Sequence, residues 1–383
     1  MKPNFVTIFP VAQNVHLIKD VGQIANAMAK NGIFKSTLVC YPNSKTYDNL
    51  KTEANHLKIE FLKPSGRFLF MEKAVLSYLK ENAKNIDVLH LFHLTKETIY
   101  YGLHYLKHNK KGKIYLKMDV YNETLKQEII YSKKWIFQKF HKLKEQSFLK
   151  KISVVSAENP ISLDLLKQRF PILENKAILV TNGINVDFIS KAFPQPKSFE
   201  EKENIILSVG RIGAEEKNYK MLMDSILGCD LNDWKLVLVG PIENNFDSYV
   251  EQKIKEHPHL KDKIELVGNV EDRVALYQYY NRSKIFCLTS PFESFGIAFI
   301  EAMYFGNYII GTDGMSSFDY ISNDLELGSR VSVNDEEALT LQLNELIIHP
   351  EKMEETYSKV QQQVAEKFYW SEIIKNLEEV LSK

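Results

Sequence analysis

Residues 284–313 read KIFCLTSPFESFGIAFIEAMYFGNYIIGTD and carry the most information in the chain. The first five residues are mostly apolar and soon meet a Ser-Pro pair, which indicates a buried strand that ends in a turn. Apolar residues then cover most of a helical surface over 295–305, and Gly306 ends this predicted helix. A second strand follows over residues 308–310. Strand, buried helix and strand in this order predict a parallel sheet covered by helices.

Two carboxylates flank the first turns of the predicted helix. Glu293 falls in the loop before it, and Glu301 falls on the helix eight positions later. A buried carboxylate needs hydrogen-bond donors, and the hydroxyls of a carbohydrate are such donors. The backbone amides of Ser294, Phe295 and Gly296 add a site for negative charge, because the first N–H groups of a helix lack internal partners. The plainer alternative is that Glu293 caps the helix and Glu301 is solvated.

Two cations follow another predicted strand, over residues 205–209. Arg211 comes directly after it, and Lys217 comes six residues later, before a predicted helix over 219–227. Both side chains should project from one loop at the carboxyl edge of the sheet, where α/β proteins bind ligands. Arg offers a planar fork and Lys a point charge, which together suit a diphosphate. Either residue alone would be read as a solvated loop cation.

The segment from Glu293 to Glu301 resembles the Glu-x7-Glu signature of the retaining GT-B glycosyltransferases of group 1, the bacterial-type family-four class that uses nucleotide sugars. Three further segments resemble other landmarks of the family, in the same order and at roughly the same spacing. They are Ser208-Val209-Gly210-Arg211 together with Lys217, then Leu238-Val239-Gly240, and then Val267-Gly268-Asn269. The resemblance is specific over about residues 175–320 and rests on pattern alone in the N-terminal half. It implies an α/β GT-B fold, in which two Rossmann-like, doubly wound domains face each other across a cleft.

The resemblance also implies an activity. A hexose or N-acetylhexosamine would move from a UDP-sugar, with retention, to a hydroxyl of a cell-surface glycan, glycoprotein, teichoic-acid-like or lipid-linked acceptor. The catalytic residues would be Arg211, Lys217 and Glu293. The donor-binding residues would be Gly210, Asn269, Ser294, Phe295, Gly296 and Glu301, with Glu301 at the ribose. Neither a metal nor another cofactor is expected, since the two cations would stabilise the departing diphosphate.

Two other functions fit the same fold. A nucleotide-sugar epimerase would process the donor alone. A non-enzymatic GT-B partner subunit would keep the fold to bind or stabilise an active transferase. Loss of Arg211, Lys217 or the two glutamates would favour the partner subunit, and all four are present.

The chain is long enough for two domains. Residues 1–195, with a C-terminal crossover helix within 368–383, are predicted to form an acceptor-binding domain, and residues 196–367 a nucleotide-sugar-binding domain. A proline-containing linker is expected over 193–203. Strands are predicted at residues 5–10, 37–40, 59–62, 88–92, 114–116, 153–155 and 178–180 of the first domain, and at 205–209, 236–239, 264–267, 284–288 and 308–310 of the second.

The first domain has fewer of the family's landmarks. Gly22 stands where a strand meets a helix predicted over 17–30, so either ligand contact or packing would explain it. Asp119 follows the strand at 114–116, where the family often shows a His-Asp pair near the transferred sugar. Both residues are acceptor-side candidates. His90 and His93 lie on or just after a buried strand and are read as hydrogen-bonded structural residues.

Composition limits the remaining choices. No apolar run approaches a membrane span and no signal-peptide cleavage site appears, so we expect a cytoplasmic protein. The three cysteines have no metal-like spacing and are predicted to be reduced core thiols. Residues 1–190 contain 29 Lys and Arg against 16 Asp and Glu, and the remainder contains 20 against 33, which gives +13 and −13. This asymmetry suggests that the N-terminal half meets an anionic partner.

One segment concentrates that positive charge. Residues 124–151 hold eight lysines and two glutamates among aromatic residues. Ile129, Ile136, Phe140 and Leu143 are predicted to share one helical face, as in a helix that lies at the inner surface of an anionic membrane. A solvated helix that packs the same apolar stripe onto the sheet is the alternative. Nucleic acid is not expected, since no nucleic-acid-binding module accompanies the lysines.

Overall fold

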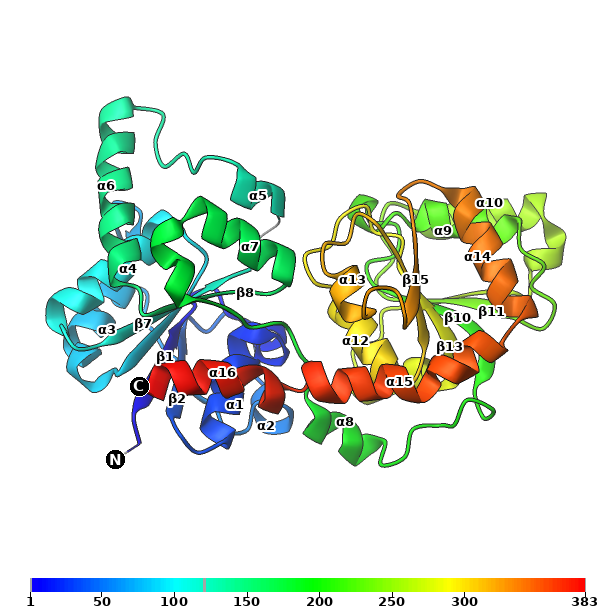
Figure 1. Cartoon of the computed structure of the whole chain (residues 1–383), viewed down its shortest axis with the longest axis horizontal. Coiled ribbons are helices and arrows are strands. Elements are labelled where there is room, and N and C mark those ends of the chain that lie inside the picture. The colour runs from blue at the N-terminus through cyan, green and yellow to red at the C-terminus, as the bar shows by residue number, and fades with distance from the viewer. Residues whose placement is uncertain (1, 120–121, 383) are drawn as a thin grey trace. The chain divides into compact units, whose positions relative to one another are not determined.

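The computed structural model describes residues 2–119 and 122–382 and divides the chain into two α/β units (Figure 1). Unit 1 extends to Asn185 and resumes at Tyr369, and unit 2 runs from Val186 to Phe368. The boundary thus precedes helix α8 (Val186–Ala192), earlier than the predicted position after residue 195. The reason is packing, because Phe188 of α8 lies 6.3 Å, between ring centroids, from a tyrosine ring of unit 2.

The predicted linker over 193–203 is fixed to unit 2. The Lys197 backbone N–H donates to Asn281 Oδ1 at 2.9 Å, and the Lys197 carbonyl accepts a hydrogen bond from the Tyr357 hydroxyl at 2.7 Å. Phe199, in the same segment, is buried. These contacts make residues 193–203 part of unit 2 rather than a flexible connection.

Unit 1 is built on a seven-stranded parallel sheet, which contains every strand predicted there. From one edge to the other the strands are β3 (Lys58–Phe61), β2 (Lys35–Cys40), β1 (Asn4–Ile8), β6 (Val88–Phe92), β7 (Lys113–Met118), β8 (Val154–Ala157) and β9 (Ala177–Leu179). The short antiparallel hairpin β4 (Arg67–Phe68) and β5 (Met71–Glu72) was not predicted.

Helices cover both faces of this sheet (Figure 1). One face packs α1 (Asp20–Lys30) and the C-terminal α16 (Trp370–Ser382) through an apolar core around Phe5 and Leu38. The other core contains residues of α3 (Lys73–Asn82), α4 (Lys96–His108), α6 (Trp135–Lys151) and α7 (Pro160–Arg169). Shorter elements are η1 (Asn14–Ile18), α2 (Asn49–Thr52), η2 (Ala83–Asn85), α5 (Asn122–Lys126) and η3 (Pro171–Lys176). The predicted return of the last helix to unit 1 is confirmed.

Unit 2 is built on a six-stranded parallel sheet in the order of a Rossmann fold. The strands are β12 (Ile264–Gly268), β11 (Lys235–Val239), β10 (Glu203–Val209), β13 (Ser283–Cys287), β14 (Tyr308–Thr312) and β15 (Gly328–Val331), of which β15 was not predicted. The helices are α9 (Tyr219–Leu227), α10 (Phe246–Glu256), α11 (Arg273–Arg282), α12 (Ile297–Tyr304), α13 (Phe318–Ile321), α14 (Glu336–Ile348) and α15 (Glu351–Lys367), with η4 (Glu215–Lys217) and η5 (Pro258–Leu260).

Two predictions from composition can be compared with the structure. Cys40, Cys229 and Cys287 are buried and form no disulfide, as expected. Of the helices in the described residues, none combines the length and apolar character that crossing a membrane would need.

Candidate active site

The order of the strands in unit 2 identifies where a ligand would bind. Strands β10 and β13 are neighbours in the sheet but not in the sequence, and the chain winds outward from them in both directions. Such a switch point opens a crevice at the carboxyl ends of the two strands. The loop after β10 contains Gly210, Arg211 and Lys217, and the loop after β13 contains Glu293. The fold therefore brings together the cations and the carboxylate that the sequence singled out.

Lys217 and Glu293 make direct contact. Lys217 Nζ lies 2.5 Å from Glu293 Oε2, and each side chain is 21% exposed. The Thr289 hydroxyl holds the lysine loop to the end of β13, because it hydrogen-bonds the carbonyls of Lys217 and Asn218 at 3.2 and 2.9 Å. The pair is thus placed by backbone contacts as well as by charge.

Arg211 is the more exposed of the two cations. Its guanidinium pairs with Glu216, from the same loop, and lies 3.6 Å from Glu243 Oε1. Its side chain is 53% exposed, so solvent screens both ion pairs. Arg211 therefore stands on the loop that also carries Lys217, within reach of an anion in solution.

Serine side chains hold the loop that carries Glu293. The Ser316 backbone N–H donates to the Glu293 carbonyl at 3.3 Å, and the Ser316 hydroxyl donates to the Ser294 carbonyl at 3.2 Å. The Ser317 hydroxyl donates to the Phe295 carbonyl at 2.5 Å. Sequence reasoning missed this support, which comes from the segment after β14.

The helix after this loop starts later than predicted. Gly296 is the N-cap residue of α12 and has a φ of +84°, a conformation that favours glycine. A Cβ at Gly296 would also lie 2.9 Å from the Phe299 ring. Ser294 and Phe295 therefore precede the helix rather than form its first turn, and Phe295 is buried.

Glu301 lies on α12 as predicted, but it is buried among donors rather than solvated. Its Oε1 accepts hydrogen bonds from Tyr277 at 3.1 Å and Arg273 at 3.3 Å, and its Oε2 accepts one from Tyr280 at 3.2 Å. A carboxylate has about four acceptor positions. These three donors leave one position on Oε2, so the carboxylate is held in place with capacity for one further donor.

Sequence reasoning missed the three donors to Glu301. Arg273, Tyr277 and Tyr280 recur at helical spacing along α11 and so share one face of it. Burial, with the nearby Glu301 carboxylate, raises the pKa of Tyr280 well above its ordinary value, so this hydroxyl stays a donor. Their spacing would have predicted the common face but not the glutamate that it meets.

Glycines let three strand ends of unit 2 approach closely. A Cβ at Gly240, after β11, would lie 1.7 Å from the Gly210 carbonyl oxygen, so only glycine fits. The Gly240 N–H in turn donates to the Gly268 carbonyl at 2.8 Å. Asn269 follows as an exposed residue directly beyond β12. The predicted donor-binding positions Gly210 and Asn269 thus follow β10 and β12, on either side of the end of β11.

In unit 1, Asp119 belongs to a cluster of buried acids. Burial, with the nearby Asp119, raises the pKa of Asp20 to about 6, and the same two causes raise the pKa of Glu158 well above its ordinary value. Burial also acts to raise the pKa of Asp119, but the hydrogen bond from Glu158 and the charge of Lys117 outweigh it and lower the pKa overall. These opposite directions favour Asp119 as the charged carboxylate and Glu158 as its neutral neighbour.

Gly22 lies at the entry to a helix, as predicted, but the bounds of that helix differ. It falls in the first turn of α1, because η1 and α1 replace the single helix expected over 17–30. A Cβ at Gly22 would lie 2.4 Å from the Leu17 carbonyl oxygen. Close packing of α1 on η1 explains this glycine, and ligand contact is not needed.

The two histidines of β6 and the following loop behave differently. His90 is fully buried, hydrogen-bonds Thr7 at 3.0 Å and stacks on Tyr115, which confirms its structural role. His93, with a φ of +57°, lines a cavity of about 270 Å³. The cavity lies at the β1 and β6 switch point of unit 1, and its wall includes Phe9, Arg67, Phe70, Glu72 and Tyr101. Sequence reasoning missed this cavity, since the hairpin that lines it was not predicted.

Among residues 2–119 and 122–382, no three or more His, Cys, Asp or Glu side chains are grouped as a metal site would need.

Comparison with known proteins identifies the family of the second unit. Residues 190–363 match the family described as "Glycosyl transferases group 1". The chain is 27% identical over 203 residues to the phosphatidyl-myo-inositol mannosyltransferase of Mycobacterium leprae. The matched region covers 52% of this chain and 51% of that protein. The chain thus spans about half the length of that relative.

Two further similarities extend over more of the chain. One relative is the N-acetylgalactosamine-N,N'-diacetylbacillosaminyl-diphospho-undecaprenol 4-alpha-N-acetylgalactosaminyltransferase of Campylobacter jejuni. The chain is 26% identical to it over 302 residues, which cover 76% of this chain and 78% of that protein. The fold of this chain also matches that of Anabaena HepE, which was solved in complex with UDP-glucose. The TM-score is 0.71, the identity is 14%, and 99% of each chain is covered. The chain has the GT-B fold, and its residues 190–363 match the group 1 family of glycosyl transferases.

Proposed function

We propose that this protein transfers a hexose or N-acetylhexosamine from a UDP-sugar to a hydroxyl of a glycan or lipid-linked acceptor, with retention at the anomeric carbon and without a metal. One observation carries the proposal. The family's cation and carboxylate positions, Lys217 and Glu293, are in contact at the β10 and β13 switch point. A lysine that a carboxylate orients at this edge is positioned to receive the donor diphosphate.

The choice of UDP and of a lipid-linked acceptor draws on the relatives. Anabaena HepE was solved with UDP-glucose. The Campylobacter jejuni relative acts, by its name, on a sugar carried by diphospho-undecaprenol, and the Mycobacterium leprae relative acts on phosphatidyl-myo-inositol. These properties belong to those proteins and support the same classes of donor and acceptor here.

In this proposal the donor occupies unit 2. As the bond to the sugar breaks, negative charge gathers on the leaving diphosphate, and Arg211 and Lys217 stabilise it. Their positive charge takes the part that a divalent metal has in other transferases. Glu293, with the amides of Ser294, Phe295 and Gly296, holds the sugar hydroxyls.

The nucleoside end of the donor would lie farther along α12. Glu301 accepts a ribose hydroxyl on the position that its three protein donors leave vacant. The backbone at Gly210 and the exposed Asn269 contact the nucleotide, with Asn269 near the base. Glu293 lies in the loop before α12 and Glu301 in the second turn of that helix, so the two carboxylates serve different parts of the donor.

The acceptor would bind to unit 1. The cavity beside His93 offers aromatic rings for a sugar face, together with Arg67 and Glu72 for its hydroxyls. Asp119 retains its negative charge near His93, which suits hydrogen bonds from sugar hydroxyls. No side chain is assigned as nucleophile. The leaving diphosphate takes the acceptor proton, as the family resemblance implies.

A donor screen tests this function. Purified protein is incubated with UDP-, GDP- and ADP-sugars, and release of the nucleoside diphosphate and the configuration of the released or transferred sugar are followed by NMR. The proposal expects turnover of a UDP-sugar, with the α-configured donor giving an α-configured product. Isomerised sugar without transfer would identify an epimerase. Absence of turnover from every donor, with and without candidate acceptors, would favour the partner subunit.

A further inference from the structure

Helix α6 exposes the side that a surface helix normally buries. Ile136, Phe140 and Leu143 recur at helical spacing and share one face, as the sequence predicted, and their side chains are 61%, 48% and 57% exposed. The predicted fourth member, Ile129, precedes the helix. These exposures contradict the alternative in which the stripe packs on the sheet.

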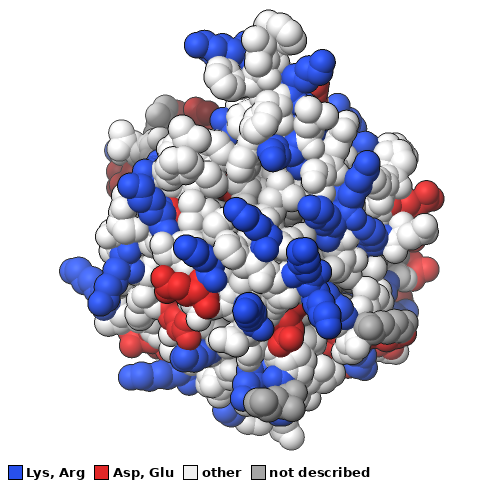
Figure 2. Space-filling view, turned by 90° about the vertical axis from the view of Figure 1, so that its left-hand side faces the viewer, with Lys and Arg blue, Asp and Glu red and all other residues white. Residues whose placement is uncertain are grey.

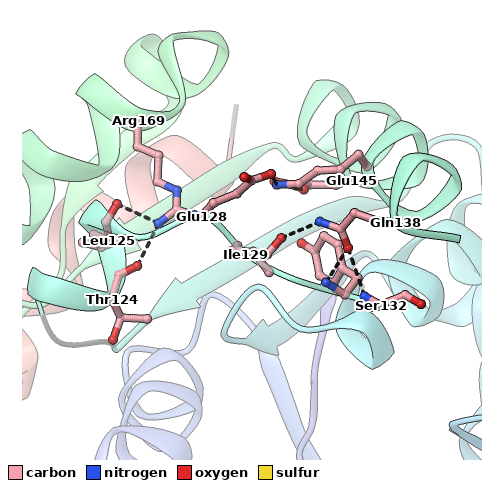
Figure 3. Close-up of polar contacts among 10 residues, drawn as sticks. Thr124, Leu125, Glu128, Ile129, Ser132, Gln138, Glu145 and Arg169 are labelled. Atoms are coloured by element: carbon pink, nitrogen blue, oxygen red, sulfur yellow. Dashed lines mark hydrogen bonds and ion pairs between the residues drawn. The ribbon is translucent and has the colours of Figure 1, made fainter. Parts of the chain in front are cut away.

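The opposite side of α6 holds the helix in place through polar contacts and, near the end of the helix, through buried apolar side chains. Gln138 accepts hydrogen bonds from the backbone of Tyr131 and Ser132 at 2.7 and 3.0 Å and donates to Ile129 at 2.9 Å (Figure 3). His141 bonds the Tyr100 hydroxyl of α4 at 3.0 Å, and Phe148 is fully buried. The outward stripe is therefore fixed in its orientation.

The neighbouring segment is fixed as well. Arg169 of α7 donates to the carbonyls of Thr124 and Leu125 at 2.8 and 2.6 Å (Figure 3). Lys142 reaches Glu145 at 3.2 Å and Glu128 at 3.9 Å. Helix α5 is thus tied to α7, and the loop between α5 and α6 is tied to α6.

Exposed apolar residues extend around the first turn of α6. Trp135, Ile136 and Phe137 are consecutive, are 73%, 61% and 54% exposed, and span about 200° at roughly 100° per residue. Ile130, just before the helix, is 75% exposed. We name this surface the apolar tip. It comprises Ile130, Trp135, Ile136, Phe137, Phe140 and Leu143.

Lysines surround the apolar tip. Lys133, Lys134 and Lys139 are exposed, and none forms an ion pair with another residue of the described chain. Lys144 lies over the Phe140 ring at 5.4 Å. Figure 2, which faces the side of unit 1 that carries α3, α4 and α6, shows many more Lys and Arg than Asp and Glu side chains. Charge and apolar surface thus coincide on one part of unit 1.

The β4 and β5 hairpin presents two more exposed apolar side chains, Phe68 and Leu69, at 56% and 77%. Phe70, which follows them, packs against His141 of α6 with ring centroids 5.9 Å apart. Phe70 also lines the cavity beside His93. The cavity therefore adjoins α6 through Phe70, which meets the side of the helix that faces unit 1.

We propose that the apolar tip inserts into the surface of an anionic lipid bilayer, with Lys133, Lys134, Lys139 and Lys144 at the level of the lipid phosphates. Aromatic and aliphatic side chains enter the boundary between headgroups and acyl chains, and lysines add attraction to anionic lipid. The cavity beside His93, which adjoins α6 through Phe70, would meet the headgroup end of a lipid-linked acceptor. The docking itself is independent of the transfer reaction.

The shape of the apolar tip favours a bilayer over a protein partner. A protein groove covers one face of a helix, whereas the exposed apolar residues at the start of α6 span more than half of its circumference. A fluid lipid phase surrounds all of them at once. A large exposed apolar surface with a polar rim marks an interaction site, and here the rim consists of lysines.

Tryptophan fluorescence of the full chain provides a specific test. The chain has three tryptophans, of which Trp135 is 73% exposed while Trp234 and Trp370 are 3% and 5% exposed. Vesicles of phosphatidylcholine with phosphatidylglycerol are added without donor or acceptor. We expect a blue shift and quenching by brominated lipid, both of which Trp135→Phe should abolish while binding in flotation persists.

Matched variants separate the apolar and charged contributions. Ile136→Ser with Phe140→Ser and Leu143→Ser should weaken vesicle binding by about tenfold or more, whereas the equally exposed Leu341→Ser with Ile348→Ser should not. Lys133, Lys134 and Lys139 changed to Gln should weaken binding about 10²-fold, at about fivefold per lysine. The control is a variant in which three lysines that are exposed elsewhere in unit 1 are changed to Gln, namely Lys45, Lys51 and Lys63.

Three outcomes would overturn the proposal. One is failure of the folded protein, checked by circular dichroism, to float with anionic vesicles. Another is equal binding by the apolar-tip variants and their controls. The third is concentration-dependent self-association that the same apolar substitutions abolish in the absence of lipid, which would assign the apolar tip to a second copy of the chain.

Discussion

Lys217 and Glu293 are 76 positions apart in the sequence, and their charged groups lie 2.5 Å from each other. Each follows a different strand of one parallel sheet, and the two strands are adjacent. In the proposed donor complex the lysine is shared between a carboxylate and a diphosphate. Glu293 would thus position the cation as well as bind the sugar.

Glu293 and Glu301 should respond differently to neutralisation. Glu293→Gln removes an anion that competes for Lys217, so UDP affinity should not fall, while sugar transfer should slow. Glu301→Gln removes the acceptor for the ribose and should weaken UDP binding by about 10- to 100-fold, the loss of a charged hydrogen bond. Calorimetry with UDP on both variants measures this difference. Equal losses of UDP affinity would contradict the two roles.

Chelation should leave the reaction running. The proposed leaving-group stabilisation comes from Arg211 and Lys217, so activity in excess EDTA should match that of the untreated enzyme. Initial rates before and after dialysis against EDTA provide the measurement. Loss of activity that Mn²⁺ restores would show that a metal takes part.

The Asp20 carboxyl should make stability depend on pH. Its pKa of about 6 exceeds the ordinary value of 3.8, so between these values the folded state binds more protons than the unfolded state. The free energy of unfolding should therefore fall as pH rises through this window, by at most about 3 kcal/mol from this group. Asp20→Asn should remove the part of the decline that comes from this group, while the raised pKa of Glu158 leaves a remainder.

Urea unfolding at several pH values between 4 and 8 tests this prediction. The stability of Asp20→Asn relative to wild type should rise up to about pH 6 and then stay constant. Asp164→Asn, at an exposed position of α7, is the control and should keep the wild-type profile. A constant difference between Asp20→Asn and wild type across the range would contradict the buried-acid interpretation.

Gly22 should prove to be a packing residue. A Cβ placed 2.4 Å from the Leu17 carbonyl forces η1 and α1 apart, so Gly22→Ala should destabilise the protein by roughly 1–3 kcal/mol. At a temperature where the variant is folded, its kcat/KM should equal that of wild type. A fall in kcat/KM without a fall in Tm would instead restore a ligand-binding role.

The sequence predicted the strands of both sheets far better than the contacts of the site. Period and composition are local properties, so β10 and β13 could be placed from the residues alone. The pairing of Glu301 with Tyr280 depends on how α11 packs against α12, which no local pattern specifies. The hairpin that lines the unit 1 cavity was missed for a related reason, since two-residue strands have no readable period.

The residue at which a helix begins was also predicted wrongly where the backbone conformation changes. Gly296 adopts a positive φ and delays the start of α12, although the apolar pattern begins earlier. The apolar stripe of α6 is present as predicted. Whether it faces the core or the solvent follows only from the exposed fractions of its side chains in the folded protein. Periodicity identifies an apolar face and does not identify what covers it.

The central claim is that the loop after β10 receives the diphosphate of a nucleotide sugar. Its most direct test is the kcat/KM for a turned-over UDP-sugar in Arg211→Ala and Lys217→Ala, with Lys220→Ala, at an exposed position on α9, as the matched control. In Arg211→Ala and in Lys217→Ala, kcat/KM should fall by about 10²- to 10³-fold while Tm is unchanged, as expected when one transition-state donor is removed. Lys220→Ala should match wild type. Wild-type kcat/KM in both Arg211→Ala and Lys217→Ala would contradict the account.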